Sequence, residues 1–195
     1  MSEVFTREGA SVCLRPIRED DVDAIMAWIN DPEITRNFAA FGDPVTRDQE
    51  LAFIRDMRAS KTDRLFAIER VGEPPAKGAA RQSEPGLIGT AGIHRIYWPA
   101  KNGRLGLMVG KHALQGQGIG QQTMRLLVAY AFEVLKLHKV WLVHYADNQR
   151  MRHIAGKLGF VQEGVLRDEY FHQGRWHDMV RHALLESDGA VSVPQ

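Results

Sequence analysis

Cysteine is almost absent from this sequence, and its scarcity removes several classes of structure. Cys13 is the only cysteine in 195 residues, so a disulfide framework and a cysteine-based zinc site are both excluded. We interpret Cys13 as a buried strand residue and not as a nucleophile. A chain without disulfides is typical of a reducing compartment, and we therefore expect a cytoplasmic protein. We also expect no metal cofactor.

Long apolar runs and an excess of one charge are missing as well. No apolar run reaches the ~18 residues that a membrane span needs, and the first residues do not resemble a signal peptide. The chain has 25 Lys and Arg against 24 Asp and Glu, a net charge of +1. This balance argues against a nucleic-acid surface and against a polybasic membrane contact. We expect neither nucleic acid nor membrane as a partner.

The remaining composition is that of a folded protein, with 44% hydrophobic and 25% charged residues. Its length suits one hydrophobic core. We predict one domain over residues 1–187, with a flexible loop at 71–86, where Gly, Pro and Ala are dense. Residues 188–195 are predicted to be a disordered tail.

The first third of the chain predicts one strand and two helices. Residues 11–17 alternate as a strand, and Val22, Ile25, Met26 and Ile29 then mark one helix face. That helix is expected to end near Asn30-Asp31-Pro32. Thr46 and Gln49 form a capping-box pattern for a second helix. Its predicted apolar face is Leu51, Phe53, Ile54 and Met57.

Strands and helices alternate in the rest of the chain. Strands are predicted at 65–69, 87–97, 104–109, 139–145, 161–171 and 176–185, the last two as a hairpin. Helices are predicted at about 118–135, with an inner face of Ile119, Thr123, Leu127, Tyr130 and Val134, and after a cap at Asp147 or Asn148, ending at Gly159. This order predicts a mixed α/β fold with helices on the faces of a sheet.

Three alternating glycines open the helix at 118. Gly116, Gly118 and Gly120 follow a predicted strand and loop, and the first amides of a helix can bind phosphate where no Cβ blocks the approach. The Walker pattern is excluded, because Gln121 and Gln122 stand where Lys and Ser or Thr are required. The dinucleotide fingerprint is excluded by its missing third glycine. The glycines therefore predict an anion site of another kind.

Four segments in order resemble one family. Gln115-x-x-Gly118-x-Gly120 is similar to the pyrophosphate loop of the GNAT superfamily of N-acetyltransferases. The segment from Asn148 to Lys157-Leu158-Gly159-Phe160 resembles the next helix of that family. Two further segments resemble its RimJ/RimL branch, the ribosomal-protein N-terminal acetyltransferases: Trp28-x-Asn30-Asp31-Pro32-Glu33, and Glu163-Gly164-x-Leu166-Arg167 with Gly174-x-Trp176-x-Asp178.

The resemblance implies a GNAT fold and acetyl-CoA as co-substrate. The fold would be a mostly antiparallel sheet of six to seven strands, in which parallel strands at 104–109 and 140–145 splay apart and helices cover both faces. The pantetheine arm would lie in the splay. The residues implied for acetyl-CoA are the backbones of Met108 and Val109, the amides of Gln115, Gly116, Gln117, Gly118, Ile119, Gly120 and Gln121, and the side chain of Asn148.

The resemblance also implies roles in catalysis. The Val109 amide would support the oxyanion, a contribution of roughly 3–4 kcal/mol in other acyl transfers. Many members carry a tyrosine acid where this chain has Ala155, so the acid must lie elsewhere. Tyr170 is our first candidate, with Tyr145, His94, Glu169 and His144 as the others. The residues expected to contact the acceptor are Trp28, Phe38, Phe41 and Tyr170.

The acceptor is left with three interpretations. A protein N-terminus is favoured, because deprotonating an α-amine of pKa ~7.8 at pH 7 costs only about 1 kcal/mol, against about 4.6 kcal/mol for a lysine-like amine. A small amine is the alternative: an aminoglycoside, a polyamine or a nucleotide-linked amino sugar. The near-neutral chain offers no obvious acidic trough for polycations. The third is a non-catalytic acyl-CoA-binding module. A homodimer is left open.

Overall fold

Seven strands form one sheet in the computed structural model, which describes residues 4–38, 44–71, 86–110, 112–114, 116–172 and 174–188. Their order across the sheet is β1-β2-β3-β4-β5-β7-β6, and every neighbouring pair is antiparallel except β4 and β5. The predicted mixed sheet is therefore confirmed. The strands are β1 Val12–Pro16, β2 Arg64–Arg70, β3 Leu87–Tyr97, β4 Asn102–Val109, β5 Lys139–Tyr145, β6 Val161–His172 and β7 Arg175–Leu185.

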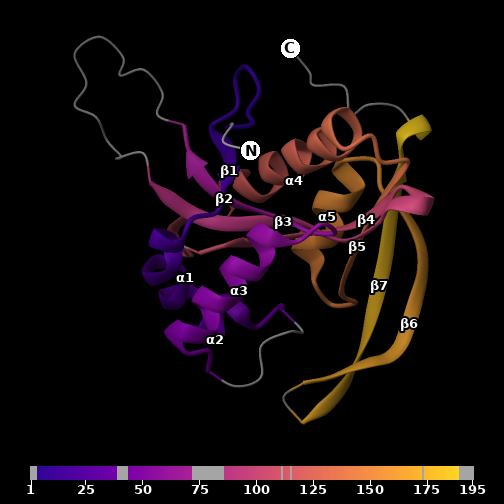
Figure 1. Cartoon of the computed structure of the whole chain (residues 1–195). Coiled ribbons are helices and arrows are strands. Elements are labelled where there is room, and N and C mark those ends of the chain that lie inside the picture. The colour runs from indigo at the N-terminus through magenta and orange to yellow at the C-terminus, as the bar shows by residue number, and fades with distance from the viewer. Residues whose placement is uncertain are drawn as a thin grey trace.

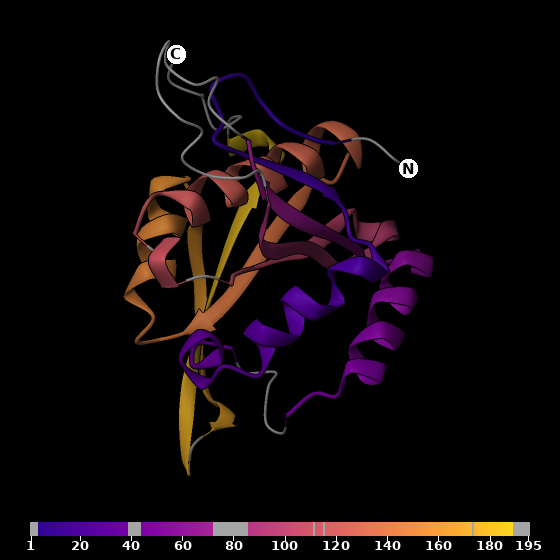
Figure 2. The ribbon, with the colours of Figure 1, turned by 90° about the vertical axis from the view of Figure 1, so that its left-hand side faces the viewer.

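Helices cover both faces of the sheet, as expected. Three helices lie on one face and two on the other, and the β6–β7 hairpin extends past the end of the sheet (Figures 1 and 2). The first face carries α1 Val22–Ile29, α2 Pro32–Thr35 and α3 Arg47–Ala59; the second carries α4 Ile119–Ala129 and α5 Gln149–Lys157. Each face has its own hydrophobic cluster, with Leu105 and Leu142 on the α4 side and Met108 on the α1–α3 side. Among the helices in the described ranges, none is long and apolar enough to cross a membrane.

The capping signals hold, but one helix face is wrong. Thr46 and Gln49 form the predicted capping box of α3, whereas Phe53 is 43% exposed and Glu50 is buried. The buried side of α3 follows Glu50 and Ile54, one turn apart, so Phe53 falls outside it. Burial raises the pKa of the Glu50 carboxyl to about 7. A pattern of apolar residues cannot indicate that a carboxyl such as that of Glu50 is buried.

The predicted end of the first helix is confirmed, and the predicted face of α4 is corrected at one residue. Helix α1 ends at Ile29 with Asn30 as its C-cap, and Asp31 then caps the short helix α2 by accepting a hydrogen bond from the Glu33 amide. After Ala129 the backbone continues in a π-helical turn, Tyr130–Val134. A wider turn moves its last residue off the α-helical stripe, and Val134 is accordingly 48% exposed.

The N-terminal strand is fixed by a buried ion pair. Arg15 donates to both carboxylate oxygens of Asp21, at 2.6 and 2.8 Å, and to Glu69 on the neighbouring strand at 2.6 Å. Burial alone would raise the pKa of Asp21, but the bonds from Arg15 outweigh burial and lower it. Cys13 on β1 is buried, as predicted. Both segments predicted to be disordered fall largely on 72–85 and 189–195, outside the described residues.

Candidate active site

The parallel strands β4 and β5 separate as predicted. They pair only through Asn102↔Lys139, Gly103↔Val140 and Arg104↔Trp141. Beyond that point β4 remains paired with β3 as far as Val109, and β5 remains paired with β7 as far as Tyr145. We use the term splay for the two facing edges, 105–109 and 142–145. Their backbone groups face each other without a ladder of hydrogen bonds.

The backbone of Val109, but not that of Met108, faces the splay. The Gly110 amide donates to the Ile88 carbonyl on β3 at 2.8 Å. Because backbone groups alternate in direction along a strand, Met108 also turns its amide and carbonyl toward β3, and its carbonyl oxygen closely approaches Gly89. Leu107 and Val109 therefore present theirs to the splay. The backbone groups of Met108 are thus directed to β3, and the expected contact of Met108 with acetyl-CoA stays a prediction.

The glycine segment forms the start of α4. Gly116 and Gly118 have φ of 82° and 77°, a region that disfavours residues with a Cβ, and both are exposed with open space around them. Gly118 is the N-cap, so the following amides have no partners within the helix. Gly120 allows close packing, since a Cβ there would lie 3.3 Å from Ile154 of α5. Gln115 lies outside the described residues.

The flanking glutamines differ in their positions. The Gln117 side chain is exposed, and its amide group donates to the Ala113 carbonyl at 2.7 Å. It lies 3.5 Å from the Arg70 guanidinium. Gln121, in the first turn of α4, is half-buried. The backbone amides of this turn, and not the glutamine side chains, are therefore the groups open to an anion.

Asn148 stands directly after β5, at the open end of the splay. Its side chain accepts a hydrogen bond from the Met151 amide at 3.1 Å and caps α5, as predicted. Its own amide donates to the Tyr145 carbonyl. Farther along α5, Ala155 is fully buried in the α4-side cluster. The position where many members of the resembling family carry a tyrosine acid is therefore filled by core packing.

On the α1–α3 face, a tryptophan supports the end of β4. Arg104, Gly106 and Met108 of β4 are directed to this face by alternation, and so is Gly110, which follows the strand. A Cβ on Gly110 would lie 2.0 Å from the Trp28 ring, so the indole packs directly on that glycine. Trp28 is 6% exposed. Trp28 therefore supports the chain at the end of β4, and its contact with the acceptor stays a prediction.

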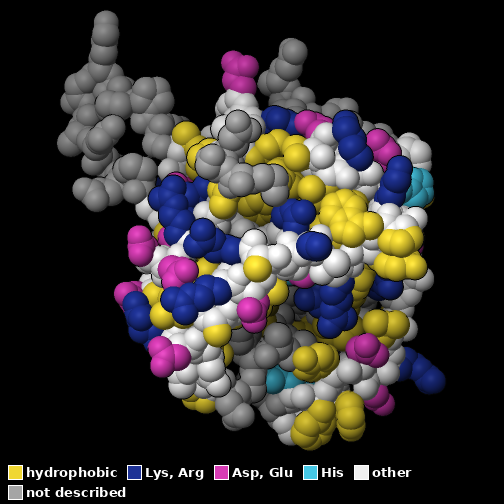
Figure 3. Space-filling model, viewed as in Figure 1, with side chains coloured by type: hydrophobic (Ala, Val, Ile, Leu, Met, Phe, Trp, Pro, Cys, Tyr) yellow, Lys and Arg dark blue, Asp and Glu magenta, His cyan; other side chains and the backbone are white. Residues whose placement is uncertain are grey.

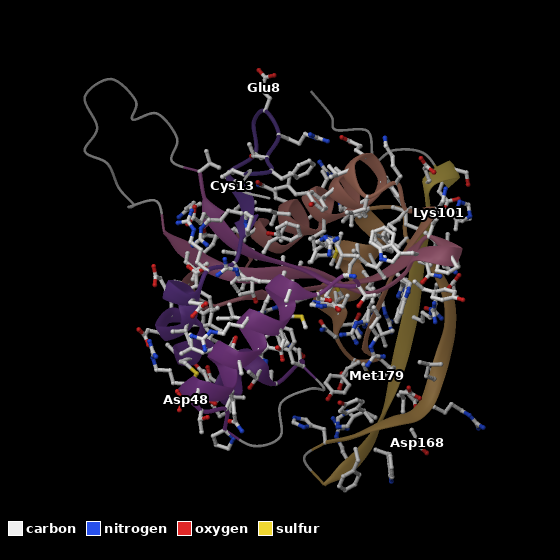
Figure 4. The ribbon with its side chains drawn as sticks, viewed as in Figure 1. Glu8, Cys13, Asp48, Lys101, Asp168 and Met179 are labelled. Carbon is white, nitrogen blue, oxygen red and sulfur yellow. The ribbon has the colours of Figure 1, made fainter. Side chains whose placement is uncertain are left out.

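The described residues include only one of the two phenylalanines that were expected to contact the acceptor. Phe38 is half-buried against the same cluster as Trp28, and Phe41 lies outside the described residues. On the other side of the open face, β7 carries Met179 toward the helices (Figure 4). Lys and Arg side chains gather between those helices and the hairpin (Figure 3). Contacts of Phe38 and Phe41 with an acceptor stay predictions.

The structure brings Tyr145 and Tyr170 into one electrostatic neighbourhood. Tyr170 pairs with His177 in the β6–β7 ladder, and the Tyr145 ring packs against His177, although the two tyrosines lie 25 positions apart in the sequence. Tyr145 is 3% exposed, its hydroxyl is buried without a hydrogen-bond partner in the described part of the chain, and its ring lies 4.8 Å from that of His177. Burial, then Tyr170, raises the pKa of Tyr145. Tyr170 is 37% exposed and open to a ligand.

His94 joins this group through the sheet. It lies opposite Arg104 on β3, and its Nδ1 is 3.4 Å from an Asp63 carboxylate oxygen. Burial, followed by the charge of Arg104, lowers the pKa of His94 against the opposing effect of Asp63. The imidazole is therefore neutral at pH 7 and able to accept a proton.

Two other candidates are turned away. His144 points to the opposite face, where it stacks on His182 with ring centroids 5.2 Å apart. Glu169 alternates with Tyr170 on β6 and points away from it.

Arg104 and Asp63 were not singled out from the sequence. A charged residue in the otherwise apolar pattern of 104–109 was the available signal for Arg104. Within the described ranges, no cluster of three or more His, Cys, Asp or Glu side chains is placed to hold a metal ion.

A splayed parallel pair followed by a glycine-opened helix defines an acyl-CoA-type transferase site. Comparison with known proteins agrees: residues 11–161 match the model of the acetyltransferase (GNAT) domain. The chain belongs to this family. Its predicted class, an acetyl-CoA-dependent N-acetyltransferase, is confirmed at that level.

Named relatives are similar over half of the chain or more. The spermidine N(1)-acetyltransferase of Escherichia coli K12 is 26% identical over 90% of this chain and 87% of that protein. The putative ribosomal N-acetyltransferase YdaF of Bacillus subtilis is 30% identical over 52% of this chain and 55% of that protein. A structure of Vibrio cholerae spermidine N-acetyltransferase in complex with CoA and spermine matches with a TM-score of 0.79 at 23% identity, covering 91% of this chain and 97% of that one.

The glycine at the N-cap of α4 gives a direct test of the anion site. We expect Gly118→Ala to weaken acetyl-CoA binding about tenfold or more, because a Cβ at φ 77° is strained and crowds the approach to the first amides. Calorimetric titration of acetyl-CoA measures this. Gly156→Ala in α5 is the matched control, since it adds the same methyl in open space. Equal affinity of Gly118→Ala and wild type would remove this loop from the site.

Proposed function

We propose that this protein transfers the acetyl group of acetyl-CoA to a primary amine of a small molecule. The observation that carries the proposal is the splay, whose edge at Leu107 and Val109 is not paired with β5. The acceptor class follows the relatives, because proteins named as spermidine N(1)-acetyltransferases match up to 90% of the chain. These names outweigh the sequence-based preference for a protein N-terminus and support the small-amine alternative.

In this proposal the cofactor completes what the chain leaves open. The pantetheine arm adds to the free edge of β4 as an extra strand and bonds to Leu107 and Val109. The pyrophosphate lies on the first amides of α4, at Ile119, Gly120 and Gln121. Asn148 contacts the arm from the end of β5 while it caps α5. The thioester then lies near the end of β4, next to the face that carries Tyr170.

The chemistry needs a neutral amine, a supported oxyanion and a proton for sulfur. The amine attacks the thioester carbonyl, and the Val109 amide donates to the oxyanion, an interaction worth roughly 3–4 kcal/mol in other acyl transfers. Collapse of the tetrahedral species breaks the carbon–sulfur bond and releases a thiolate. His94, neutral at pH 7, accepts the amine proton through water.

Accessibility separates the two tyrosines as proton donors. Tyr170 is 37% exposed, whereas the Tyr145 hydroxyl is buried. We therefore assign the proton for the leaving thiolate to Tyr170 and give Tyr145 a supporting role beneath it. The shared electrostatic neighbourhood of Tyr170, Tyr145 and Arg104 supports this arrangement.

A second candidate acceptor is a protein N-terminus. It is favoured by the likeness to the putative ribosomal N-acetyltransferase YdaF, at 30% identity over about half of the chain. The RimJ/RimL-like segments point the same way. An α-amine also needs little help to lose its proton at neutral pH.

Free-thiol release from acetyl-CoA tests the acceptor class. We expect turnover with small primary amines, and kcat/KM at least tenfold below the best of them for peptides with free N-termini. The panel contains spermidine, an aminoglycoside, amino sugars with and without phosphate, and ribosomal-protein N-terminal peptides. Turnover with the peptides alone would replace the proposal by the second candidate.

Removing the Tyr170 hydroxyl tests its role. Tyr170→Phe is expected to lower kcat about 100-fold, the range of general acid catalysis, with the acetyl-CoA KM unchanged. Tyr145→Phe, a matched loss of one hydroxyl, should lower kcat by less than tenfold. Steady-state thiol release measures both. The assignment fails if Tyr170→Phe turns over like wild type.

A further inference from the structure

Arg104 stands at the closed end of the splay. It is the last residue of β4 that pairs with β5, opposite Trp141, and it lies opposite His94 on the other neighbour, β3. Its side chain shares the α1–α3 face with Met108, which packs among the helices there. Tyr145 lies on this face as well, because Leu142, three residues before it on β5, packs on the α4 side, and Tyr170 is joined to Tyr145 through His177.

Other shielded arginines of this sheet have partners, and Arg104 does not. Arg15 pairs with Asp21 and Glu69, Arg64 donates to two carbonyls, and Arg181 lies over the Trp141 ring and 3.2 Å from a Glu163 oxygen. For Arg104, no hydrogen bond or ion pair forms with any residue in the described ranges. Since a guanidinium stays charged in proteins, a half-buried positive charge is left without a partner.

Asp63, the carboxylate whose charge acts on Arg104, already accepts other hydrogen bonds. Asp63 accepts hydrogen bonds from Ser60 at 2.8 Å, from Thr62 at 3.0 Å and from the Arg95 amide at 3.1 Å. It also faces His94. The further charge of Arg95 acts on Arg104 with the same sign. This end of the face is therefore positive, and the positive charge is open to a ligand.

Next to Arg104, β4 carries a glycine. Gly106 is the next residue of β4 on the same face, and a Cβ there would meet only the His94 ring, at 3.9 Å. The same ring covers Gly92, opposite Gly106 on β3, because a Cβ on Gly92 would lie 2.4 Å from the His94 Nε2. Arg104 and Val109 are about 16 Å apart along the strand at ~3.3 Å per residue. A molecule that reaches from the thioester to Arg104 is therefore elongated.

From this placement we infer that Arg104 is a specificity-determining residue that binds an anionic group of the acceptor. The inference rests on the proposed function and narrows it: the preferred substrate is an elongated small molecule with a primary amine at one end and a phosphate or carboxylate at the other. An amino-sugar phosphate or a nucleotide-linked amino sugar has this chemistry. Spermidine, a polycation, would bring ammonium groups against an unpaired guanidinium, and like charges oppose binding.

Paired acceptors that differ only in the anion test the inference. Wild type is expected to acetylate glucosamine 6-phosphate with a kcat/KM at least tenfold above that for glucosamine or spermidine, as one charge-assisted bond provides. Arg104→Gln should remove this preference, and Arg104→Lys should restore part of it. Arg58→Gln on α3 is the control, an exposed arginine that loses the same charge. The acetyl-CoA affinity should stay within twofold in all four proteins.

Two results of the kinetic comparison would overturn the inference. One is the same phosphate preference in wild type and Arg104→Gln; the other is a wild type that prefers spermidine, with a kcat/KM that Arg104→Gln leaves unchanged. If no acceptor turns over, titration of the CoA complex with glucosamine 6-phosphate separates the two proposals. Binding that Arg104→Gln abolishes upholds the anion site while the proposed function fails. Binding that is absent, or equal in both proteins, contradicts the anion site itself.

Discussion

The rest of the site depends on the failure of β4 and β5 to stay paired. Each strand keeps its outer partner to the end, β3 for β4 and β7 for β5, so the inner edges separate without loosening either half of the sheet. Unpaired strand edges present donors and acceptors in a row. An extended ligand can satisfy that row as a further strand would. The separation begins after Arg104 and Trp141. This point limits how far an extended ligand can reach between the two strands.

The parts around the splay serve its two ends. At the open end, Trp28 packs on Gly110, the residue that follows β4. Asn148 fixes the start of α5 by donating its backbone amide to the Tyr145 carbonyl. In the chain, α4 is the next α-helix after β4, so its first amides follow the strand that forms one edge of the splay. At the closed end, Arg104 leaves an unpaired charge. Donor binding and acceptor selection are thus assigned to opposite ends of one unpaired edge.

Local patterns in the sequence were enough for the frame of the fold. The bounds of β3 and β5 match their predictions, and the capping box at Thr46, the cap at Asn148 and the turn at Gly159 hold. These features depend on neighbours within a few residues. The splay was predicted only through the family resemblance, because separation of two strands has no local signal.

What the sequence missed depends on long-range packing. The burial of Glu50, the exposure of Phe53 and Val134, and the supporting role of Trp28 are set by contacts between distant elements. The acceptor expectation also shifted. Sequence segments favoured a protein N-terminus, whereas most of the chain's length is matched by relatives named for spermidine. That Arg104 has no ion-pair partner among the described residues also depends on the three-dimensional arrangement, and no local sequence pattern predicts it.

Amide hydrogen exchange with and without CoA tests the splay most directly. If the pantetheine arm adds to the free edge of β4, CoA should slow exchange at the Leu107 and Val109 amides by tenfold or more. The Met108 amide, which already faces β3, should exchange at the same rate in both states. Binding of CoA with no change at Leu107 and Val109 would contradict the account.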